Sequence, residues 1–593
     1  MEEEKTTAKT NQTLNKAEYG SDVIVDVLKE LDIEYISMNP GATLQGIHDS
    51  LVNYGGNKKP EIVLCCHEEI AVDLAHGYNM VSSKPMAAMV HNIIGLLHAT
   101  MAIFNAWVGR IPVLVIGGTG PVNTEERRPW IDWIHTAVDQ GNVVRDYVKW
   151  DNLAASLPAA VNAILRGYKI SNAEPRGPVY VCLDSAIQEK KLAKSEPMPD
   201  ASRYVPPASP QADPTALSKA AEMLFNAEHP VVIADFLGMK TGAMESLVEL
   251  AETLSLPVLD KDGMLSIPTT HPLDLTGAEN DLFAEADVIL SLDVFDLYQA
   301  LNMRETAVPL KNPPVNAKII DISLRHYSVK GWVQDFGELQ PVDLDISADT
   351  ALAIPALTSI VKEMLAQQPG KRQQLQERFA RLKAKHEAVR GAWQIEADKT
   401  SDETHISRTG LAVDLWAAIK NEDWVLINNA RFNQPRQLWD ITKPYQYIKR
   451  GQGGGIGFGI GRALGVALAH RPHKRLCVDI QPDGDLLYTS SGLWTAAHQR
   501  IPLLILMFNN RSYFNTENRQ FIIAKHRGRE VSNKIVGNRI ENPAVDFATV
   551  ARGFGVYGQG PIEKREDLAP ALIRAIAYIK EKRLPALVDV IIP

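Results

Sequence analysis

Short apolar runs alternate with helical segments along most of the chain. Runs of about five apolar residues bounded by turn residues are typical of buried strands, and apolar residues spaced three and four apart are typical of helices. Strands that alternate with helices predict parallel sheets covered by helices, which is the α/β fold class. The predicted strands are 34–38, 62–66, 86–90, 112–116, 178–183, 230–234, 288–292, 318–322, 424–427, 476–480, 503–508 and 586–592.

Two segments interrupt this alternation and divide the chain. Residues 197–214 are polar and rich in proline, which removes a backbone donor and fixes φ, so they predict an extended linker. After Pro369 and Gly370, apolar residues recur at helical spacing between charged ones, which predicts an amphipathic connecting helix. The predicted division is an N-terminal domain at 17–190, a central Rossmann-like domain at 210–365, a linker helix at 370–400 and a C-terminal domain at 403–593.

One internal similarity links the two ends of the chain. Residues 109–116 read GRIPVLVI, and residues 499–506 read QRIPLLIL. Both segments predict the end of a helix followed by a buried strand. The similarity is a hint that the first and last domains share a fold, but chance similarity between two apolar strands explains it equally well.

The composition is that of an ordinary soluble protein. Of 593 residues, 45% are hydrophobic and 22% charged, and the net charge of −9 argues against a nucleic-acid-binding surface. The longest apolar stretch, 86–117, is interrupted by polar residues and does not predict a membrane span. The first residues lack the apolar core of a signal peptide, and four cysteines without metal-binding spacing suit a reducing compartment. We therefore expect a cytoplasmic protein that binds neither nucleic acid nor membrane.

The most informative polar residues lie in the segment 476–514. It reads as a strand, an acidic turn at Asp483 and Gly484, a helix, a second strand and then the pair Asn509-Asn510. The carboxyl ends of parallel strands share the edge of the sheet where ligands bind. Carboxylate and amide oxygens are ligands that Mg²⁺ prefers, and glycine lets the backbone approach a phosphate. An Asp-Gly pair alone is as compatible with a simple turn, but Asn510, 510 − 483 = 27 residues further on, favours a metal and diphosphate site.

This segment resembles the thiamine diphosphate (ThDP) signature of the family that includes acetolactate synthase, pyruvate decarboxylase and benzoylformate decarboxylase. The resemblance implies that Asp483 and Asn510 are side-chain ligands of Mg²⁺, and that the backbone carbonyl of Ser512 is the third protein ligand. Two positions depart from the pattern. Pro482 stands in place of a glycine and removes one N–H from the turn. Asp485, also a candidate for cofactor binding, stands in place of a small residue, and a carboxylate beside a diphosphate is unfavourable unless it faces the metal or solvent.

A glycine run at 451–461 precedes the strand that leads to Asp483. Alone, such a run often marks only a tight turn or close helix packing. The same resemblance implies that the carbonyl of Gly454 accepts a hydrogen bond from the aminopyrimidine, that Gly455 also contacts the cofactor, and that Ile456 lies beneath the thiazolium ring and holds the cofactor bent. Ordinary core packing is the alternative interpretation of Ile456.

Glu68 follows the strand at 62–66 and opens a predicted helix that contains Ala75-His76-Gly77-Tyr78. In the resembled family this position holds the glutamate that activates the cofactor through its pyrimidine ring. The alternative is a helix N-terminal acid that only satisfies the helix dipole. Its neighbour Glu69 is expected to be an exposed helix residue. Because this glutamate and the metal site belong to different subunits in the family, the resemblance implies a homodimer or homotetramer.

Further positions resemble benzoylformate decarboxylase only in part. His91 matches that enzyme's active-site histidine and is expected to exchange a proton near the substrate, although a buried structural histidine is the competing interpretation. Tyr298 stands where a second catalytic histidine is expected, and Ala42 stands in place of a serine that contacts the substrate. Arg128 is a candidate for binding a substrate carboxylate, but a surface arginine is the more common case.

The resemblance covers residues 17–593 and implies ThDP-binding folds at both ends of the chain around a central nucleotide-fold-like domain. It implies ThDP- and Mg²⁺-dependent cleavage or formation of a carbon–carbon bond, foremost the non-oxidative decarboxylation of a 2-oxo acid or acyl substrate. The alternatives are an acetolactate-synthase-like carboligase, a 2-hydroxyacyl-CoA lyase and a ThDP-binding regulatory subunit without activity. FAD is not expected, because residues 293–301 lack the family's flavin-associated sequence.

Overall fold

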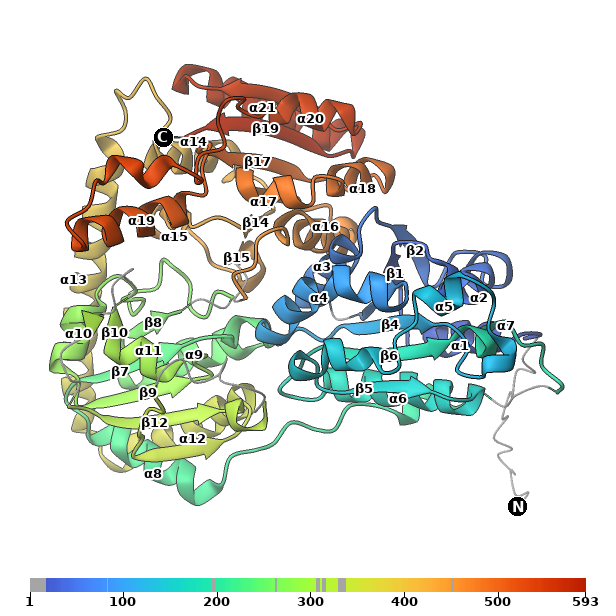
Figure 1. The fold of residues 1–593 in the computed structure, drawn as a ribbon. Helices are drawn as coiled ribbons and strands as arrows, with labels where there is room; N and C mark the ends of the chain where they lie inside the picture. The colour runs from blue at the N-terminus through green and yellow to red at the C-terminus, as the bar shows by residue number, and fades with distance from the viewer. Residues whose placement is uncertain are drawn as a thin grey trace, which may run out of the picture.

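The structure, a computed structural model, describes residues 17–82, 84–194, 198–261, 264–304, 310–311, 316–328, 338–449 and 453–592. Figure 1 shows three α/β domains, with the N-terminal domain in blue and cyan, the central domain in green and yellow, and the C-terminal domain in orange and red. Each domain is built around one parallel sheet, which confirms the predicted fold class.

The N-terminal sheet has six strands in the order β2-β1-β3-β4-β6-β5. Its strands are β1 (Tyr35–Met38), β2 (Glu61–Leu64), β3 (Met86–Val90), β4 (Leu114–Thr119), β5 (Asp151–Ala154) and β6 (Val179–Asp184). Its helices are α1 (Gly20–Glu30), α2 (Gln45–Asp49), α3 (Glu68–Val81), α4 (Asn92–Val108), α5 (Ile131–Ile134), α6 (Leu157–Asn172) and α7 (Ser185–Glu189).

The C-terminal sheet has six strands in the order β15-β14-β16-β17-β19-β18. Its strands are β14 (Trp424–Asn428), β15 (Tyr447–Ile448), β16 (Leu476–Pro482), β17 (Leu504–Asn509), β18 (Tyr557–Ile562) and β19 (Ala586–Ile591). Its helices are α14 (Arg408–Ile419), α15 (Gln434–Leu438), α16 (Gly459–His470), α17 (Asp483–Tyr488), α18 (Gly492–His498), α19 (Phe514–His526), α20 (Phe547–Gly553) and α21 (Arg565–Lys582).

The first and last sheets have the same topology. Numbered within each domain, both sheets run 2-1-3-4-6-5. The similar segments 109–116 and 499–506 lead into β4 and β17, which are the fourth strand of each sheet. Arg110 and Arg500 also share a left-handed backbone, with φ of 54° and 50°. A shared fold, and not chance, therefore accounts for the internal sequence similarity.

The central domain has a five-stranded parallel sheet in the order β13-β12-β9-β7-β8, an order known from doubly wound nucleotide-binding folds. Its strands are β7 (Pro230–Ala234), β8 (Val258–Asp260), β9 (Val288–Leu292), β12 (Lys318–Ser323) and β13 (Leu344–Ser347), and β10 (Met303–Arg304) pairs separately with β11 (Leu310–Lys311). Its helices are α8 (Pro214–Asn226), α9 (Ala243–Leu254), α10 (Glu279–Glu285), α11 (Leu297–Asn302) and α12 (Thr350–Gln367).

Every predicted strand is present, and each main-sheet strand that the hydrophobic pattern missed lies at the edge of a sheet. The missed strands are β5, β8, β13, β15 and β18. β5 and β13 have partly exposed residues, and β8 and β15 have only three and two residues. Interior strands of parallel sheets are buried on both faces and give continuous apolar runs, whereas short or half-exposed edge strands do not.

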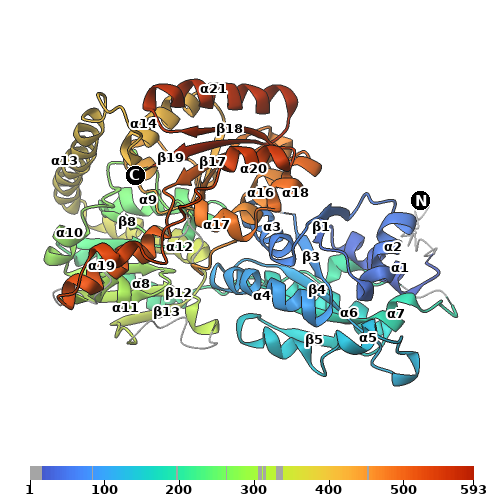
Figure 2. The same ribbon diagram turned by 45° about the horizontal axis from the view of Figure 1, so that its top comes forward.

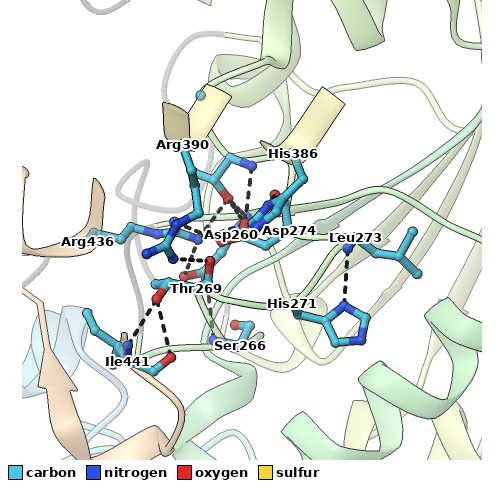
Figure 3. Close-up of polar contacts among 12 residues, drawn as sticks. Asp260, Ser266, Thr269, His271, Leu273, Asp274, His386, Arg390, Arg436 and Ile441 are labelled. Carbon is cyan, nitrogen blue, oxygen red and sulfur yellow. Dashed lines mark hydrogen bonds and ion pairs between the residues drawn. The ribbon is translucent and has the colours of Figure 1, made fainter. Parts of the chain in front are cut away.

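The linker helix α13 (Lys371–Asp398) runs along the outside of the molecule and joins the central to the C-terminal domain (Figures 1 and 2). Leu375 and Leu382 pack into the central core. Figure 3 shows a buried polar network beside this helix, in which Arg436 of α15 pairs with Asp260 and Asp274 of the central domain. The network fixes the central domain against the C-terminal domain.

The N-terminal and C-terminal domains of the chain pack through α3 and α16. Gly465 of α16 lies against Leu74 of α3, and Gly77 of α3 lies against the backbone of Arg462. Small residues on both helices allow the two backbones to approach closely. No helix within the described parts of the chain is both long and apolar enough to span a bilayer.

Candidate active site

The predicted metal ligands meet at the carboxyl-terminal edge of the C-terminal sheet. Asp483 begins α17 directly after β16, and Asn510 follows the neighbouring strand β17. The backbone N–H of Ser512 donates to Asp483 Oδ2 at 3.2 Å and to Asn510 Oδ1 at 3.0 Å. Residues that are far apart in sequence thus place two side-chain oxygens around one backbone group.

The Asp483 carboxylate is almost fully enclosed. Burial raises its pKa to about 6, although hydrogen bonds from the backbone N–H groups of Gly484 and Ser512 oppose that shift. A nearby cation would favour the charged form of this carboxylate. The oxygens of Asp483 and Asn510 are hard ligands of the type that Mg²⁺ prefers.

The backbone around this edge is held by its own side chains. Asn509 accepts a hydrogen bond from the N–H of Arg511 and donates to Asp589 on β19. The Ser512 hydroxyl donates to Glu517 on α19 at 2.6 Å. These bonds fix the turn that carries Asn510, so its position does not depend on a ligand.

Gly484 lies against the ring of Tyr513, and a Cβ at this position would overlap that ring. Pro482 ends β16 in register with Phe508 of β17 and precedes the first turn of α17. Proline has no N–H to offer a diphosphate, so Gly484 and the residues after it are the remaining backbone donors in this turn.

Asp485 is directed at the glycine run. Its Oδ1 accepts from the N–H of Gly457 at 2.8 Å, and its Oδ2 accepts from the N–H of Gly459 at 3.0 Å and from the side chain of Gln481 at 2.7 Å. Both oxygens are therefore bonded to the protein. The additional carboxylate that the sequence places in this turn holds the glycine run in position.

Of the glycine run, residues 451 and 452 lie outside the described residues. Gly454 has φ of 66° and open space around it, whereas Gly455 packs against the side chain of Met101 on α4. Ile456 is half-buried. The run lies between α4 of the N-terminal domain and the turn of Asp485.

Glu68 is the first residue of α3 and is 4% exposed. Its Oε2 lies 3.1 Å from Nδ1 of His98, whose side chain is 52% exposed. His98 in turn stacks on His67, with ring centroids 5.1 Å apart. Sequence spacing did not reveal His98 as a partner, because it comes from α4, thirty residues away (98 − 68 = 30).

Glu69 is not the exposed helix residue that we expected. It is 8% exposed, and its Oε1 has no hydrogen-bond partner among the described residues. Burial, and then the charge of Asp485, raise its pKa to about 7. The packing of α3 on α16 produces this burial, since it brings Glu69 next to Gly457.

His91 caps α4 and belongs to a small polar cluster. Its Nδ1 lies 3.0 Å from the hydroxyl of Thr43, and its Nε2 lies 3.4 Å from Nδ1 of His135. Burial and the neighbouring His135 lower the pKa of His91, so the ring is neutral at pH 7. Sequence spacing did not reveal Thr43 or His135, because both approach from separate loops.

Two other candidates have different surroundings. Tyr298 lies on α11 of the central domain, and among the described residues no polar contact of its side chain joins it to Glu68, His91 or Asp483. Arg128 is bonded to Asp132 at 2.7 Å and to Glu189 at 3.1 Å. Its guanidinium therefore stabilises the loop that carries Asp132.

A buried charged group between α3 and α16 was also missed. Arg462 is fully buried, and its guanidinium donates to Asn429 and to the backbone of Lys449. Asp73 faces it from α3, and burial raises the pKa of Asp73 well above its usual value. The sequence feature that could have revealed this group is one charged residue within each of two largely apolar helices, Asp73 in α3 and Arg462 in α16.

Within the single chain, none of the polar contacts among the described residues joins Glu68 to Asp483 or Asn510. Exposed apolar side chains flank both halves of the candidate site. Leu97 lies beside His98, Trp130 precedes α5 and Trp133 lies on it just before His135, and Leu487, Tyr488 and Phe514 lie near Asp483. Exposed apolar side chains grouped around a polar site are typical of an interface with another protein molecule.

The chain matches three protein-family models. They are the N-terminal TPP binding domain of thiamine pyrophosphate enzymes at residues 19–143, the central domain of these enzymes at 217–357, and their C-terminal TPP binding domain at 433–590. The three matches follow one another in the order of the three sheets.

Curated relatives match most of the chain. The acetolactate synthase large subunit of Haemophilus influenzae is 24% identical over 554 residues, which are 91% of this chain and 89% of that protein. The benzoylformate decarboxylase of Pseudomonas aeruginosa is 25% identical over 550 residues, 89% of this chain and 91% of that protein. The glyoxylate carboligase of Escherichia coli O157:H7 is 24% identical over 567 residues, 93% and 89% of the two chains.

Solved structures share the fold over nearly the whole length. The benzoylformate decarboxylase from Polynucleobacter necessarius has a TM-score of 0.76 at 17% identity and covers 97% of this chain and 98% of its own. The ThDP-dependent 4-hydroxybenzoylformate decarboxylase of Rhodococcus jostii RHA1 has a TM-score of 0.73 at 20% identity, with the same coverage of 97% and 98%. Identities this low establish the fold and leave the substrate open.

Proposed function

The chain belongs to the thiamine pyrophosphate enzyme family, and from this premise we propose that it catalyses the ThDP- and Mg²⁺-dependent, non-oxidative decarboxylation of a 2-oxo acid. Carboligation is the alternative outcome at the same site, if a second carbonyl compound enters before the product leaves. The observation that carries the proposal is the convergence of Asp483 and Asn510 on the N–H of Ser512 at the edge of the C-terminal sheet.

The residues present fit a Mg²⁺-diphosphate group. Asp483 and Asn510 supply side-chain oxygens, and the carbonyl of Ser512 supplies the third protein ligand. Mg²⁺ usually takes only a few protein ligands when phosphate oxygens complete its octahedron. Asp485 holds the glycine run from the same turn, so the turn and the run form one preorganised unit.

The bound ThDP would supply an electron sink for the carbon–carbon bond that breaks next to the carbonyl. Glu68 would hold a proton at the pyrimidine ring, and its partner His98 keeps the carboxylate oriented from α4. Glu69 points instead to the glycine run of its own chain, which favours Glu68 over Glu69 for this role.

His91 would exchange a proton with the substrate. The ring is neutral near pH 7, so one of its nitrogens can accept a proton while the other donates. Thr43 and His135 contact the two ring nitrogens and fix the plane of the ring. The exposed apolar side chains of Trp130 and Trp133, at and on α5, would shield this group from water.

A second copy of the chain completes the site in this proposal. Glu68 and His91 lie at the edge of the N-terminal sheet, and the metal ligands lie at the edge of the C-terminal sheet. Both edges carry exposed apolar residues, among them Trp133, Tyr488 and Val138, which is 99% exposed. Pairing of two chains would bury these side chains and bring the two edges together, which supports a homodimer or homotetramer.

Isothermal titration with ThDP at saturating Mg²⁺ tests the proposal, using the wild type, Asp483→Ala and Asp402→Ala. Asp402 is an exposed carboxylate, so its variant matches the loss of charge without touching the site. We expect binding that Asp483→Ala abolishes and Asp402→Ala retains. The absence of binding by the wild type would refute the cofactor site.

The reaction is tested with a panel of 2-oxo acids, by measuring CO₂ release and the organic product with and without an acceptor aldehyde. Release of CO₂ with an aldehyde product supports simple decarboxylation, and a coupled hydroxyketone indicates carboligation. Intact ThDP binding without turnover across the panel would contradict the proposed reaction and favour a regulatory subunit.

A further inference from the structure

A large cleft lies where all three domains meet. Its volume is about 790 Å³, within the range of about 300–1,000 Å³ that is typical of small-molecule sites. The N-terminal domain contributes the end of α3 and the residues just before β3, and the C-terminal domain contributes the segment between α16 and β16. The linker at 206–209 and the loop after β7 close the remaining sides. We refer to this cavity as the three-domain cleft.

The three-domain cleft is on the opposite side of the sheets from the candidate active site. Glu68 begins α3 at the active-site edge, whereas Asn79–Val81 at the other end of α3 line the cleft. At about 1.5 Å per residue, the 14 residues of α3 separate the two places by roughly 20 Å. The cleft is therefore a separate site, and an inference about it does not rest on the proposed catalytic function.

Three cationic side chains line the cleft although the chain as a whole is acidic. Lys84, Arg176 and Arg475 line it against one acidic residue, Glu174, while the net charge of the chain is −9. The side chains of Lys84 and Arg176 are 51% and 46% exposed, so each has free donors besides its ion pair. Each cation is ion-paired, to Glu34, Glu174 and Asp423 respectively, so the cleft would hold an anion through the remaining N–H donors of these side chains.

Arg475 is held in a fixed orientation at the wall of the cleft. Its guanidinium stacks 3.8 Å above the ring of Tyr445, and its Nε donates to Asp423 at 3.1 Å. A guanidinium that is already oriented loses little entropy when it binds a carboxylate or phosphate.

His470 also holds Arg475 in place. The residue is 4% exposed, burial lowers its pKa to about 4, and the ring is therefore neutral. Arg475 donates to its Nδ1 at 3.1 Å, and since a guanidinium cannot accept, the ring hydrogen must be on Nε2. This Nε2 is buried and has no hydrogen-bond partner among the described residues. Because this nitrogen has almost no accessible surface, it faces the protein interior, and the role of His470 at the cleft is to orient Arg475 through Nδ1.

We propose that the three-domain cleft binds a small organic anion, either a phosphate ester or a dicarboxylate. Lys84, Arg176 and Arg475 contact its charged group. Tyr445 and the proline-rich linker contact its uncharged part. The volume of the cleft is larger than inorganic phosphate needs, which is why the ligand is an organic molecule.

The test is isothermal titration of the protein at saturating ThDP and Mg²⁺, with AMP, succinate, inorganic phosphate and uncharged adenosine as probes. The variant Lys84→Gln/Arg176→Gln removes two exposed cations from the cleft. Its control, Lys58→Gln/Arg166→Gln, removes two exposed cations of the same domain outside the cleft. We expect AMP or succinate to bind saturably, and the cleft variant to raise Kd roughly tenfold or more.

The control variant should leave that Kd unchanged. AMP binding identifies a phosphate ester, and succinate binding identifies a dicarboxylate. The proposal is overturned if neither probe saturates, if both variants behave alike, or if adenosine or inorganic phosphate binds as tightly as AMP. If the protein proves not to bind ThDP, the same titration without cofactor still compares the two variants. A wrong proposed function can therefore be distinguished from a wrong proposal about the cleft.

Discussion

Gly465 of α16 lies so close to Leu74 of α3 that a Cβ on Gly465 would overlap the carbonyl oxygen of Leu74 and lie 2.6 Å from the nitrogen of Tyr78. Two backbones in direct contact join the N-terminal and C-terminal domains. Each helix begins at a candidate-site edge, since α3 starts with Glu68 and α16 starts with Gly459 within the glycine run. The alignment of the two edges within the chain therefore depends on this contact.

Gly465→Ala should destabilise the protein strongly. The added methyl group has no room, because its neighbours are backbone atoms that cannot rotate away. Overpacking of this kind costs about 1–3 kcal/mol or more in the free energy of unfolding. Gly391→Ala on α13 is the matched control, since a Cβ there meets nothing within 4 Å and alanine is the better helix former. Urea unfolding measures the free energy of unfolding of both variants. Equal values for Gly465→Ala and wild type would refute the tight contact.

Glu69→Gln should make the protein less sensitive to rising pH. The folded state holds a proton on Glu69 up to about pH 7, while the unfolded state releases it near the ordinary value of 4.5. The raised pKa of Glu69 therefore adds to the free energy of unfolding below pH 4.5. This contribution is lost as the pH rises through 7. Between pH 5 and pH 8, we expect the free energy of unfolding of Glu69→Gln to rise by about 1–3 kcal/mol relative to that of the wild type.

The measurement is the free energy of urea unfolding at the two pH values. Glu30→Gln, at an exposed position near the end of α1, is the control and should follow the wild type at both. A parallel pH dependence of Glu69→Gln and wild type would show that Glu69 is charged in the folded protein near neutral pH.

Glu68→Gln and Glu69→Gln should separate catalysis from packing. In the proposed function Glu68 holds the proton at the cofactor, so Glu68→Gln should keep ThDP binding but lower kcat by roughly a hundredfold or more. Glu69→Gln changes a neighbouring carboxylate that faces the glycine run, and it should retain most of kcat. Steady-state kinetics on the active 2-oxo acid, with ThDP titration of each variant, measure the difference. The reverse ranking of the two variants would assign the role to Glu69.

Arg436→Ala should loosen the central domain. Arg436 is buried and pairs with Asp274 at 3.0 Å and with Asp260 at 3.4 Å (Figure 3). Removing it leaves buried carboxylates, of which Asp260 still has Lys449 at 3.0 Å. Breaking a buried ion pair costs about 3–5 kcal/mol. Arg381→Ala, at an exposed position on α13, should stay within about 0.5 kcal/mol of wild type.

Unfolding in urea measures the stability of both variants, and limited proteolysis in the linker at 198–213 reports opening of the domains. Faster cleavage of Arg436→Ala than of Arg381→Ala is expected. An unchanged cleavage rate together with unchanged stability would mean that the junction is held by its apolar contacts alone.

The hydrophobic pattern by itself determined the interior strands, the three-domain fold and the linker helix, because strands buried on both faces must be continuously apolar. The order of the motifs around Glu68, the glycine run and Asp483 pointed to the family. Short or half-exposed edge strands such as β5 and β18 left no such signal, since their pairing depends on a neighbour that is already in place. The individual assignments of the site residues remain predictions.

Only the tertiary structure decided where the polar side chains point. The sequence could not predict the partners of the Asp485 carboxylate, which accepts hydrogen bonds from the amides of Gly457 and Gly459. The sequence also predicted an exposed Glu69, whereas the packing of α3 on α16 buries this side chain. The contact of His91 with His135 likewise joins separate loops. Burial and hydrogen bonding of a side chain depend on elements distant in sequence, and local spacing cannot encode which of them approaches.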